Sequence, residues 1–373
     1  MRLLATVVVY AGASAWIPAS GSAKVSNDTA YRGGDGVAVD TAASGKATQL
    51  VVLAGTDPRK SPMAKVSVFT DDGKNGSWAP AVAIGSMGSS GRAASLDGSL
   101  YFVGGTCTTA PCRELSPGYP YLNHTLKLAP GARKWERVAG IPFAVTDPKD
   151  APIGAGVASH ALVALGEHVY SVGGTNGTAS LDALWRYTPK TDTWKQMQSM
   201  RVRRCYVAVT VYDGKIYAIG GSTTPAGPGG GSALGPGAVT SAEVYDVEAD
   251  SWTLLKAQMK VARSTLAAAT LGKHIYAVGG ENGGAVSVSF ASVERLDVSD
   301  PEAAWEQIAN MTMPRCQVGA GVLGNALFAV GGYNDKTDLS WLRSVERYDS
   351  ASDSWRAVAP FLEERQYIAV TVL

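Results

Sequence analysis

The sequence predicts an all-β protein in which similar four-stranded antiparallel sheets surround a common axis. An aromatic residue, two small or apolar residues and a glycine pair recur at intervals of roughly 50 residues, and a tryptophan follows each copy. The composition agrees, because 43 glycines and only 17% charged residues suit many short strands and tight turns. The predicted fold is a β-propeller with glycine pairs at residues 104–105, 173–174, 220–221, 279–280 and 331–332, and a degenerate copy at 54–55.

One repeat shows why each blade is expected to contain four antiparallel strands. Two β-rich runs, 204–212 and 215–219, flank Asp213-Gly214, a dipeptide that accepts the positive φ angles of a tight hairpin. A third strand is expected at residues 242–246, and a fourth begins at Trp252 after a short polar turn. In three repeats a tyrosine precedes the tryptophan by the same seven residues, which fixes the length of this outer hairpin.

The two ends of the chain determine how the ring is expected to close. Residues 365–373 form a first strand without the rest of its repeat, and we expect it to pair with N-terminal residues because an unpaired edge invites aggregation. The segment 36–40 is itself predicted as the first strand of the first repeat. We therefore expect six complete repeats and a seventh blade split between the termini. The competing interpretation of residues 1–23 is a secretory signal peptide cleaved after Ala13-Ser14-Ala15, which leaves the propeller in residues 24–373.

The complete pattern resembles the kelch repeat, and the resemblance covers nearly the whole chain. It rests on a hydrophobic strand, a glycine pair, and a tyrosine and tryptophan at fixed spacing, repeated six times. The resemblance implies a kelch-type β-propeller. In such a fold the glycines permit close backbone approach, and the aromatic residues fill the wedge between neighbouring twisted sheets.

Four arginines are the candidate ligand-binding charges. Arg204, Arg263 and Arg315 each stand sixteen residues before a glycine pair, and Arg365 begins the C-terminal strand. Repeat symmetry puts them in a partial ring at one mouth of the central channel, where the kelch resemblance implies a peptide-binding face. The positive charge predicts an acidic partner. The alternative is that the arginines hydrogen-bond loop carbonyls between blades. The neighbouring candidates are Ser264, Glu281, Asn282 and Tyr333, with Cys205, Cys316 and Gln366 beside them.

Glycosylation sequons and a cysteine pair favour an oxidising compartment. Cys107 and Cys112 are close enough in the chain to form a small disulfide within one loop. Five asparagines stand in Asn-x-Ser/Thr sequons, which predict glycosylation in a secreted protein. The alternative is ordinary turn chemistry in a cytoplasmic protein. The sequons are at Asn27, Asn75, Asn123, Asn176 and Asn310.

Catalytic and cofactor chemistry is not predicted. The four histidines have no metal-ligand spacing, and the chain carries no nucleophile elbow, phosphate-binding loop or zinc-protease helix. We therefore expect no catalytic residue, metal or cofactor. A net charge of +1 without a basic run argues against nucleic acid as a partner. No stretch approaches the ~18 apolar residues of a membrane span.

The expected function is that of a non-catalytic module that binds a protein or peptide in the secretory or extracellular space. One alternative that the resemblance implies is a carbohydrate-active enzyme similar to the kelch sialate mutarotases, so a glycan ligand stays open. The other alternative is an intracellular kelch adaptor. Such an adaptor would lack its own BTB region, because no BTB-like helical segment precedes the propeller in this chain.

Overall fold

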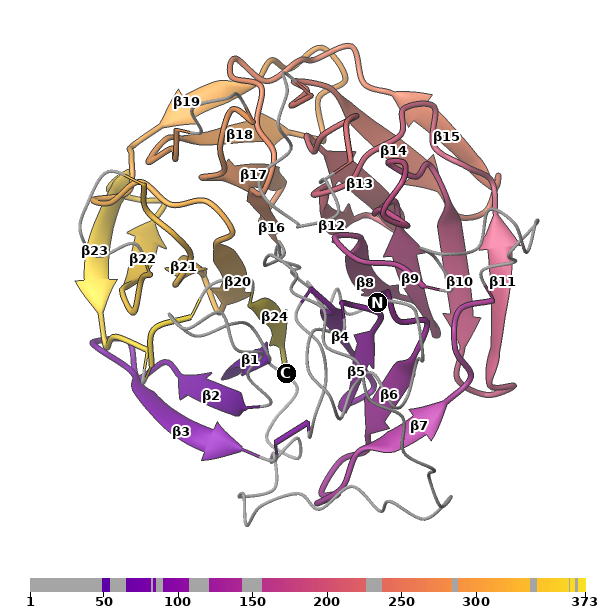
Figure 1. Cartoon of the computed structure of the whole chain (residues 1–373). Helices are drawn as coiled ribbons and strands as arrows, with labels where there is room; N and C mark the ends of the chain where they lie inside the picture. The colour runs from indigo at the N-terminus through magenta and orange to yellow at the C-terminus, as the bar shows by residue number, and fades with distance from the viewer. Residues whose placement is uncertain are drawn as a thin grey trace, which may run out of the picture.

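Six four-stranded antiparallel sheets form a closed ring, with one strand of each sheet at the centre and one at the periphery (Figure 1). The computed structural model describes residues 49–53, 65–81, 83–84, 90–106, 121–142, 156–225, 237–283, 288–335, 341–361, 363–365 and 368–373. Every regular element in these residues is a β-strand. The predicted all-β propeller of four-stranded antiparallel blades is confirmed.

Each blade runs from an inner strand to an outer strand in chain order, except blade one, whose inner strand comes from the C-terminus. Blade one contains β24 (Ala369–Val372), β1 (Gln49–Leu53), β2 (Val66–Thr70) and β3 (Ser77–Ala81). Blade two contains β4 (Arg92–Leu96), β5 (Ser99–Val103), β6 (Thr125–Leu128) and β7 (Glu136–Val138). Blade three contains β8 (Ala161–Leu165), β9 (His168–Val172), β10 (Leu184–Thr188) and β11 (Thr193–Met197).

The other three blades follow the repeat most regularly. Blade four contains β12 (Ala208–Tyr212), β13 (Lys215–Ile219), β14 (Ala242–Asp246) and β15 (Ser251–Leu254). Blade five contains β16 (Ala267–Leu271), β17 (His274–Val278), β18 (Val293–Asp297) and β19 (Glu306–Ile308). Blade six contains β20 (Gly319–Leu323), β21 (Ala326–Val330), β22 (Val345–Asp349) and β23 (Ser354–Val358).

Ring closure occurs within blade one rather than through a seventh blade. Strand β24 pairs antiparallel with β1, with Val370 opposite Val52, and the remaining edge of β1 pairs with β2. The predicted pairing of the C-terminal strand with N-terminal residues is confirmed. The prediction of residues 36–40 as the inner strand of this blade is wrong, because β24 occupies that position. Residues 1–23 and 36–40 themselves lie outside the described residues.

The glycine pairs are required where neighbouring blades come closest together. In blade four, Gly220 and Gly221 have φ angles of 61° and 93°, which L-residues with a side chain rarely adopt. A Cβ atom on Gly220 would lie 2.6 Å from the carbonyl oxygen of Arg263 in blade five. The amide of Gly221 donates a hydrogen bond of 3.0 Å to that same oxygen. The pair thus joins each blade to the next near the channel.

Tyrosine, aspartate and tryptophan join the blades at the outer edge. Trp252 stacks on Tyr245 with ring centroids 5.1 Å apart, and its indole Nε1 donates to the carbonyl of Gln198 at the end of blade three. The hydroxyl of Tyr245 donates to Asp250, whose carboxylate also accepts from the amide of Gln198. In blades three, four and six, this spacing of tyrosine and tryptophan therefore ties the outer hairpin to the preceding blade.

Candidate functional site

The face formed by the links between blades carries a narrow belt of strained residues around the channel mouth. Five residues at equivalent positions, two after the arginine position of blades two to six, have φ angles between 52° and 80° without being glycine. Such backbone costs free energy and tends to persist at functional positions. Amides of two of them donate 2.8 Å hydrogen bonds to carbonyls of the belt residue in the preceding blade. The mouth belt consists of Ser90, Ser159, Tyr206, Thr265 and Gln317.

Outside the belt, single-residue β-bridges extend each sheet toward this face. In blade five, Ser264 pairs with Glu281, which pairs with Ser289. In blade six, Cys316 pairs with Tyr333, which pairs with Trp341. The predicted site residues Ser264, Glu281 and Tyr333 are therefore brought to one face by the repeat itself. Asn282 is exposed beside Glu281, and its side-chain oxygen accepts from the amide of Val288.

The predicted arginines lie inside the blades rather than on this face. Arg263 is fully buried, and its guanidinium donates to the carbonyls of Gly279 and Ser292, to the hydroxyl of Ser292 and to the carboxylate of Glu294 at 2.8 Å. Arg204 and Arg315 make the same four contacts in blades four and six, with Glu243 at 3.0 Å and Glu346 at 2.6 Å. Burial lowers the pKa of Arg263 and Arg315, and the adjacent glutamates oppose that shift.

This burial changes the interpretation of the arginines. Their charges are neutralised by glutamates within the same blade, so they create no positive focus at the surface of the mouth. The alternative, in which the arginines hydrogen-bond loop carbonyls, fits these contacts. The carbonyls belong to the same blade as the arginine, however, rather than to a neighbouring blade. The spacing of sixteen residues reflects this internal contact, because each guanidinium donates to the carbonyl of the first glycine in the glycine pair of its own blade.

Blades one to three lack this arginine–glutamate pair. In blade one, Ser67 occupies the position of Glu243, and Arg365 donates instead to the carbonyl of Lys65 and to Glu363 at 3.4 Å. Blade three has Val157 at the arginine position. Blades four to six therefore form the regular half of the ring. Because their arginines are buried, residues other than these arginines must contact a ligand.

The buried glutamates hold the links between blades in place. Glu294 accepts from the amides of Lys260 at 2.6 Å and Val261 at 3.3 Å. Glu243 likewise accepts from the amides of Arg201 and Val202. Arg201 and Lys260 occupy equivalent positions, three residues before the buried arginines, and both are exposed. In blades four and five the buried pair therefore fixes the backbone that presents an exposed cation.

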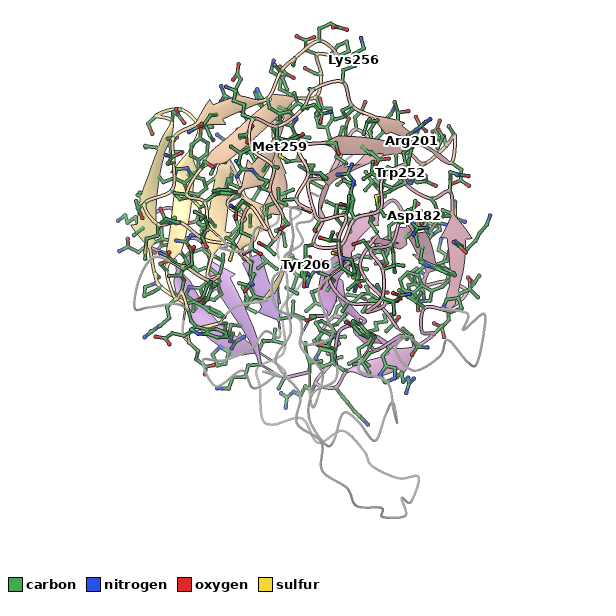
Figure 2. The ribbon with its side chains drawn as sticks, turned by 45° about the horizontal axis from the view of Figure 1, so that its top comes forward. Asp182, Arg201, Tyr206, Trp252, Lys256 and Met259 are labelled. Atoms are coloured by element: carbon green, nitrogen blue, oxygen red, sulfur yellow. The ribbon has the colours of Figure 1, made fainter. Side chains whose placement is uncertain are left out.

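Four exposed basic residues on two successive links form a surface that we call the basic rim. Arg203 lies 3.4 Å from Asp182, and Lys256 lies 3.1 Å from Glu302, whereas Arg201 donates to the carbonyl of Trp252. Figure 2 shows Arg201 beside Trp252 on one flank of the ring, Lys256 at its outer edge and Tyr206 near the axis. Sequence reasoning missed these residues because it followed only repeat-locked positions. The basic rim consists of Arg201, Arg203, Lys256 and Lys260.

The buried histidines have no visible role in ligand binding. His160 is fully buried, and burial beside Arg92 holds the pKa of its imidazole well below 6.5. Burial, with a smaller contribution from Arg137, lowers the pKa of His124 to about 4. Across the described parts of the chain, no three histidine, cysteine, aspartate or glutamate side chains are grouped so as to hold a metal ion. The same residues include no helix long and apolar enough to span a membrane.

The cysteines and sequons are placed as follows. Cys107, Cys112, Asn27 and Gln366 lie outside the described residues. Cys205 and Cys316 form no disulfide. Among the described sequons, Asn75 and Asn310 are exposed, whereas Asn123 and Asn176 are partly buried. The side-chain oxygen of Asn176 accepts from the amides of Thr178 and Ala179 and thereby closes a turn.

A comparison with protein-family models decides the family. The kelch motif matches residues 157–201, 203–257, 262–312 and 314–362, which together make up more than half of the chain. The chain belongs to the kelch-repeat family. The matched residues are blades three to six, which contain the three arginine–glutamate pairs.

Kelch proteins of several animals are similar to this chain. Kelch-like protein 36 of Mus musculus is 24% identical over 290 residues, covering 76% of this chain and 42% of its own length. Kelch-like protein 26 of Danio rerio is 29% identical over 210 residues, or 54% of this chain and 32% of its own. Beta-scruin of Limulus polyphemus is 26% identical over 61% of this chain and 23% of its own. The chain thus spans less than half the length of these relatives.

A solved structure shares the fold. The structure of YjhT superposes with a TM-score of 0.58 and covers 75% of this chain and 86% of its own, at 14% sequence identity. At this identity the likeness concerns the propeller architecture alone.

Proposed function

We propose that this kelch propeller is a non-catalytic module that binds a protein through the face formed by the links between blades, with an acidic segment of the partner on the basic rim. The observation that carries the proposal is the double role of Glu243 and Glu294. Each neutralises a buried arginine, and each fixes the link backbone from which Arg201 or Lys260 projects. Preorganised cations on a rigid scaffold reduce the entropic cost of binding.

Electrostatics supports an acidic partner, although not through the arginines first considered. The rim carries four cations, and the exposed carboxylates of Asp182 and Glu302 pair with only two of them. Exposed ion pairs of this kind are weak, because water screens them. A carboxylate-rich partner can therefore compete with Asp182 and Glu302, and it can also pair with Lys260, which forms no ion pair with the residues that the structure describes.

The carbohydrate-enzyme alternative has less support. Such an enzyme needs arginine, glutamate and tyrosine side chains that converge on a substrate in a compact pocket at the mouth. The repeat-locked guanidiniums and carboxylates of blades four to six are instead bonded to one another inside the blades. Their hydrogen-bonding capacity is used by the fold, so they are poor candidates for binding a sugar.

Secretion is part of the proposal, with Asn75 and Asn310 as the glycan acceptors that the geometry favours. Both side chains are exposed, whereas Asn123 and Asn176 are partly enclosed by the fold. Expression in a secretory eukaryotic host should give protein in the medium whose mass falls after glycosidase treatment. The double variant Asn75→Gln/Asn310→Gln should lose most of that mass difference. Unmodified protein retained in the cytosol would contradict secretion without affecting the binding proposal.

The binding proposal can be tested without a known partner. Peptides are selected from a random displayed library on the purified chain, and the selected peptides are titrated against the chain and against the variant Arg201→Ala/Lys260→Ala. We expect enrichment of aspartate and glutamate and a loss of affinity in the variant. The variant Lys215→Ala/Lys273→Ala serves as the control. It also removes two positive charges, but at hairpin turns on the face opposite the basic rim. Neutral or basic peptides that bind both variants equally would refute the proposal.

A further inference from the structure

Blade six departs from the repeat at two positions of the bridge row beside the mouth belt. The residue after the glycine pair is small or acidic in the other bridged blades, namely Thr106, Thr175, Ser222 and Glu281, but it is Tyr333 in blade six. Its bridge partner is Tyr121, Ser180, Ala238 or Ser289 elsewhere, but Trp341 in blade six. Small residues satisfy the fold at both positions in blades three and four. The pair of large aromatic residues in blade six is therefore not required by the propeller.

The two aromatic side chains lie together and remain partly exposed. Their ring centroids are 6.2 Å apart, and the planes meet at 89°. The indole nitrogen of Trp341 donates to no atom that the structure describes, whereas Trp78, Trp194, Trp252 and Trp355 each donate to a backbone carbonyl of the preceding blade. Trp341 thus lacks the contact to the preceding blade that these four tryptophans make.

Two carboxylates, Asp335 and Glu281, lie near this aromatic pair through their contacts with Ser289. Asp335 is exposed, and its Oδ1 accepts from the amide of Ser289 in blade five, which leaves Oδ2 without a partner in the described part of the chain. Ser289 also contacts the carbonyl of Tyr333. Glu281 is only 3% exposed, and burial, with smaller contributions from Glu281 and Asp335, raises the pKa of the Cys316 thiol. This arrangement concentrates negative charge next to two aromatic faces.

A further acceptor lies next to the cluster. Gln317 follows Cys316 in the chain, and its side chain is only 7% exposed. Its Oε1 is buried and accepts no hydrogen bond in the described part of the chain. A buried acceptor without a donor costs free energy.

We infer that Tyr333, Trp341 and Asp335, with Glu281 behind them, form a subsite for a basic side chain of the protein partner, an arginine or a lysine. Aromatic faces attract a cation through their quadrupole, and a carboxylate adds charge and hydrogen-bond acceptors. The nearby arginines do not compete for the subsite, because Arg263 and Arg315 are bonded to their own glutamates. The inference rests on the proposed function, and it gives the partner a basic residue to accompany its acidic segment.

The test uses three short synthetic peptides, Ac-Gly-Arg-Gly-amide, Ac-Gly-Gln-Gly-amide and Ac-Gly-Glu-Gly-amide, titrated into the full chain. The readout is the NMR resonance of the Trp341 indole N–H, assigned by its loss in Trp341→Phe. We expect a saturable shift with the arginine peptide alone. Asp335→Asn, an exposed substitution, should weaken that binding by about tenfold, the scale of roughly one cation–π or charged hydrogen-bond contact.

The controls separate this inference from the proposed function. Arg201→Ala/Lys260→Ala should bind the arginine peptide like the unaltered chain, because its changes lie on the basic rim. A Trp341 resonance that shifts equally with the glutamine or glutamate peptide, or with none of the three, would overturn the inference. Loss of acidic-peptide binding in the rim variant alongside that outcome would leave the proposed function intact.

Discussion

At the scale of single residues, one buried ion pair per blade explains most of the regularity of blades four to six. Arg263 donates to the carbonyl of the first glycine in the pair of its own blade, and Glu294 accepts from a backbone amide of the link that precedes Arg263. The arginine therefore stabilises the top of the sheet, while the glutamate fixes the chain that enters it. A buried charge without its partner is expensive, so neither residue can be lost alone.

Replacing Arg263 should therefore be far more costly than replacing its exposed neighbour. We expect Arg263→Leu to lower the free energy of unfolding by about 3–5 kcal/mol, because Glu294 stays buried without its cation. Lys260→Ala should change it by less than about 0.5 kcal/mol. Urea denaturation of the two variants measures both effects. Equal unfolding midpoints for Arg263→Leu and the unaltered chain would contradict the structural role.

Two buried histidines make the molecule sensitive to acid. The fold holds the pKa of His160 and of His124 below 6.5, so both imidazoles stay neutral in the folded state at pH values where the unfolded chain binds protons. Stability should be constant above about pH 7 and should fall as the pH drops below about 6.5, by up to about 1.4 kcal/mol per pH unit for each histidine.

The variant His160→Val isolates the contribution of His160, since blade four carries Val207 at the equivalent position. Between pH 6.5 and 5, the free energy of unfolding of this variant should fall less steeply with decreasing pH than that of the unaltered chain. The difference in slope should correspond to about one bound proton. Parallel slopes for the two proteins in urea denaturation at a series of pH values would show that His160 titrates normally in the fold.

At the scale of elements, the inner strands form the ring, and β24 is the one strand supplied from the far end of the chain. It pairs only with β1 in its sheet, while its side chains are buried against the neighbouring blades. Deleting residues 369–373 should lower the melting temperature sharply, because it exposes the edge of β1 and opens the core of blade one.

Thr371 provides the matched control for that deletion. Its hydroxyl oxygen is buried and has no hydrogen-bond partner in the described residues, so Thr371→Val keeps the strand and removes an unsatisfied group. We expect this variant to be as stable as the unaltered chain or slightly more stable. A deletion that melts like Thr371→Val would mean that β24 is not needed for closure.

At the scale of the whole molecule, the sequence was sufficient to predict the propeller but not the face that we propose for binding. The glycine pairs recur in blades two to six, and the tyrosine–tryptophan spacing recurs in blades three, four and six, because the same contacts between blades recur there. Closure was harder to predict, since the segment 36–40 resembles an inner strand as closely as β24 does. Only the pairing of β24 with β1 distinguishes them.

The candidate site was missed for a related reason. A repeated arginine resembles a ring of binding charges, and its glutamate partner lies about thirty residues further along the chain, in a different strand. Whether those two side chains meet is a property of sheet register, which spacing alone does not reveal. The exposed cations of the links, Arg201 and Lys260, have no such recurring signature beyond blades four and five.

The charge of the basic rim predicts how binding depends on salt. Because its cations are exposed, raising the ionic strength from about 0.15 M to about 1 M shortens the screening length from ~8 Å to ~3 Å. The affinity for selected acidic peptides should therefore fall several-fold, mainly through slower association. Titrations by calorimetry or surface plasmon resonance measure this. An affinity independent of salt would place the peptide away from the rim.

The most direct test compares the exposed and the buried cations in one experiment. The variants are Arg201→Ala/Lys260→Ala and Arg263→Lys. For each, the affinity for a selected acidic peptide and the urea unfolding midpoint are measured. The account predicts that the first variant keeps its stability and loses affinity, whereas the second loses stability and, while folded, binds like the unaltered chain. Lysine cannot reproduce the forked contacts of the buried guanidinium. If Arg263→Lys stays fully stable and loses affinity while the rim variant binds normally, the buried arginines are the ligand contacts and the account is contradicted.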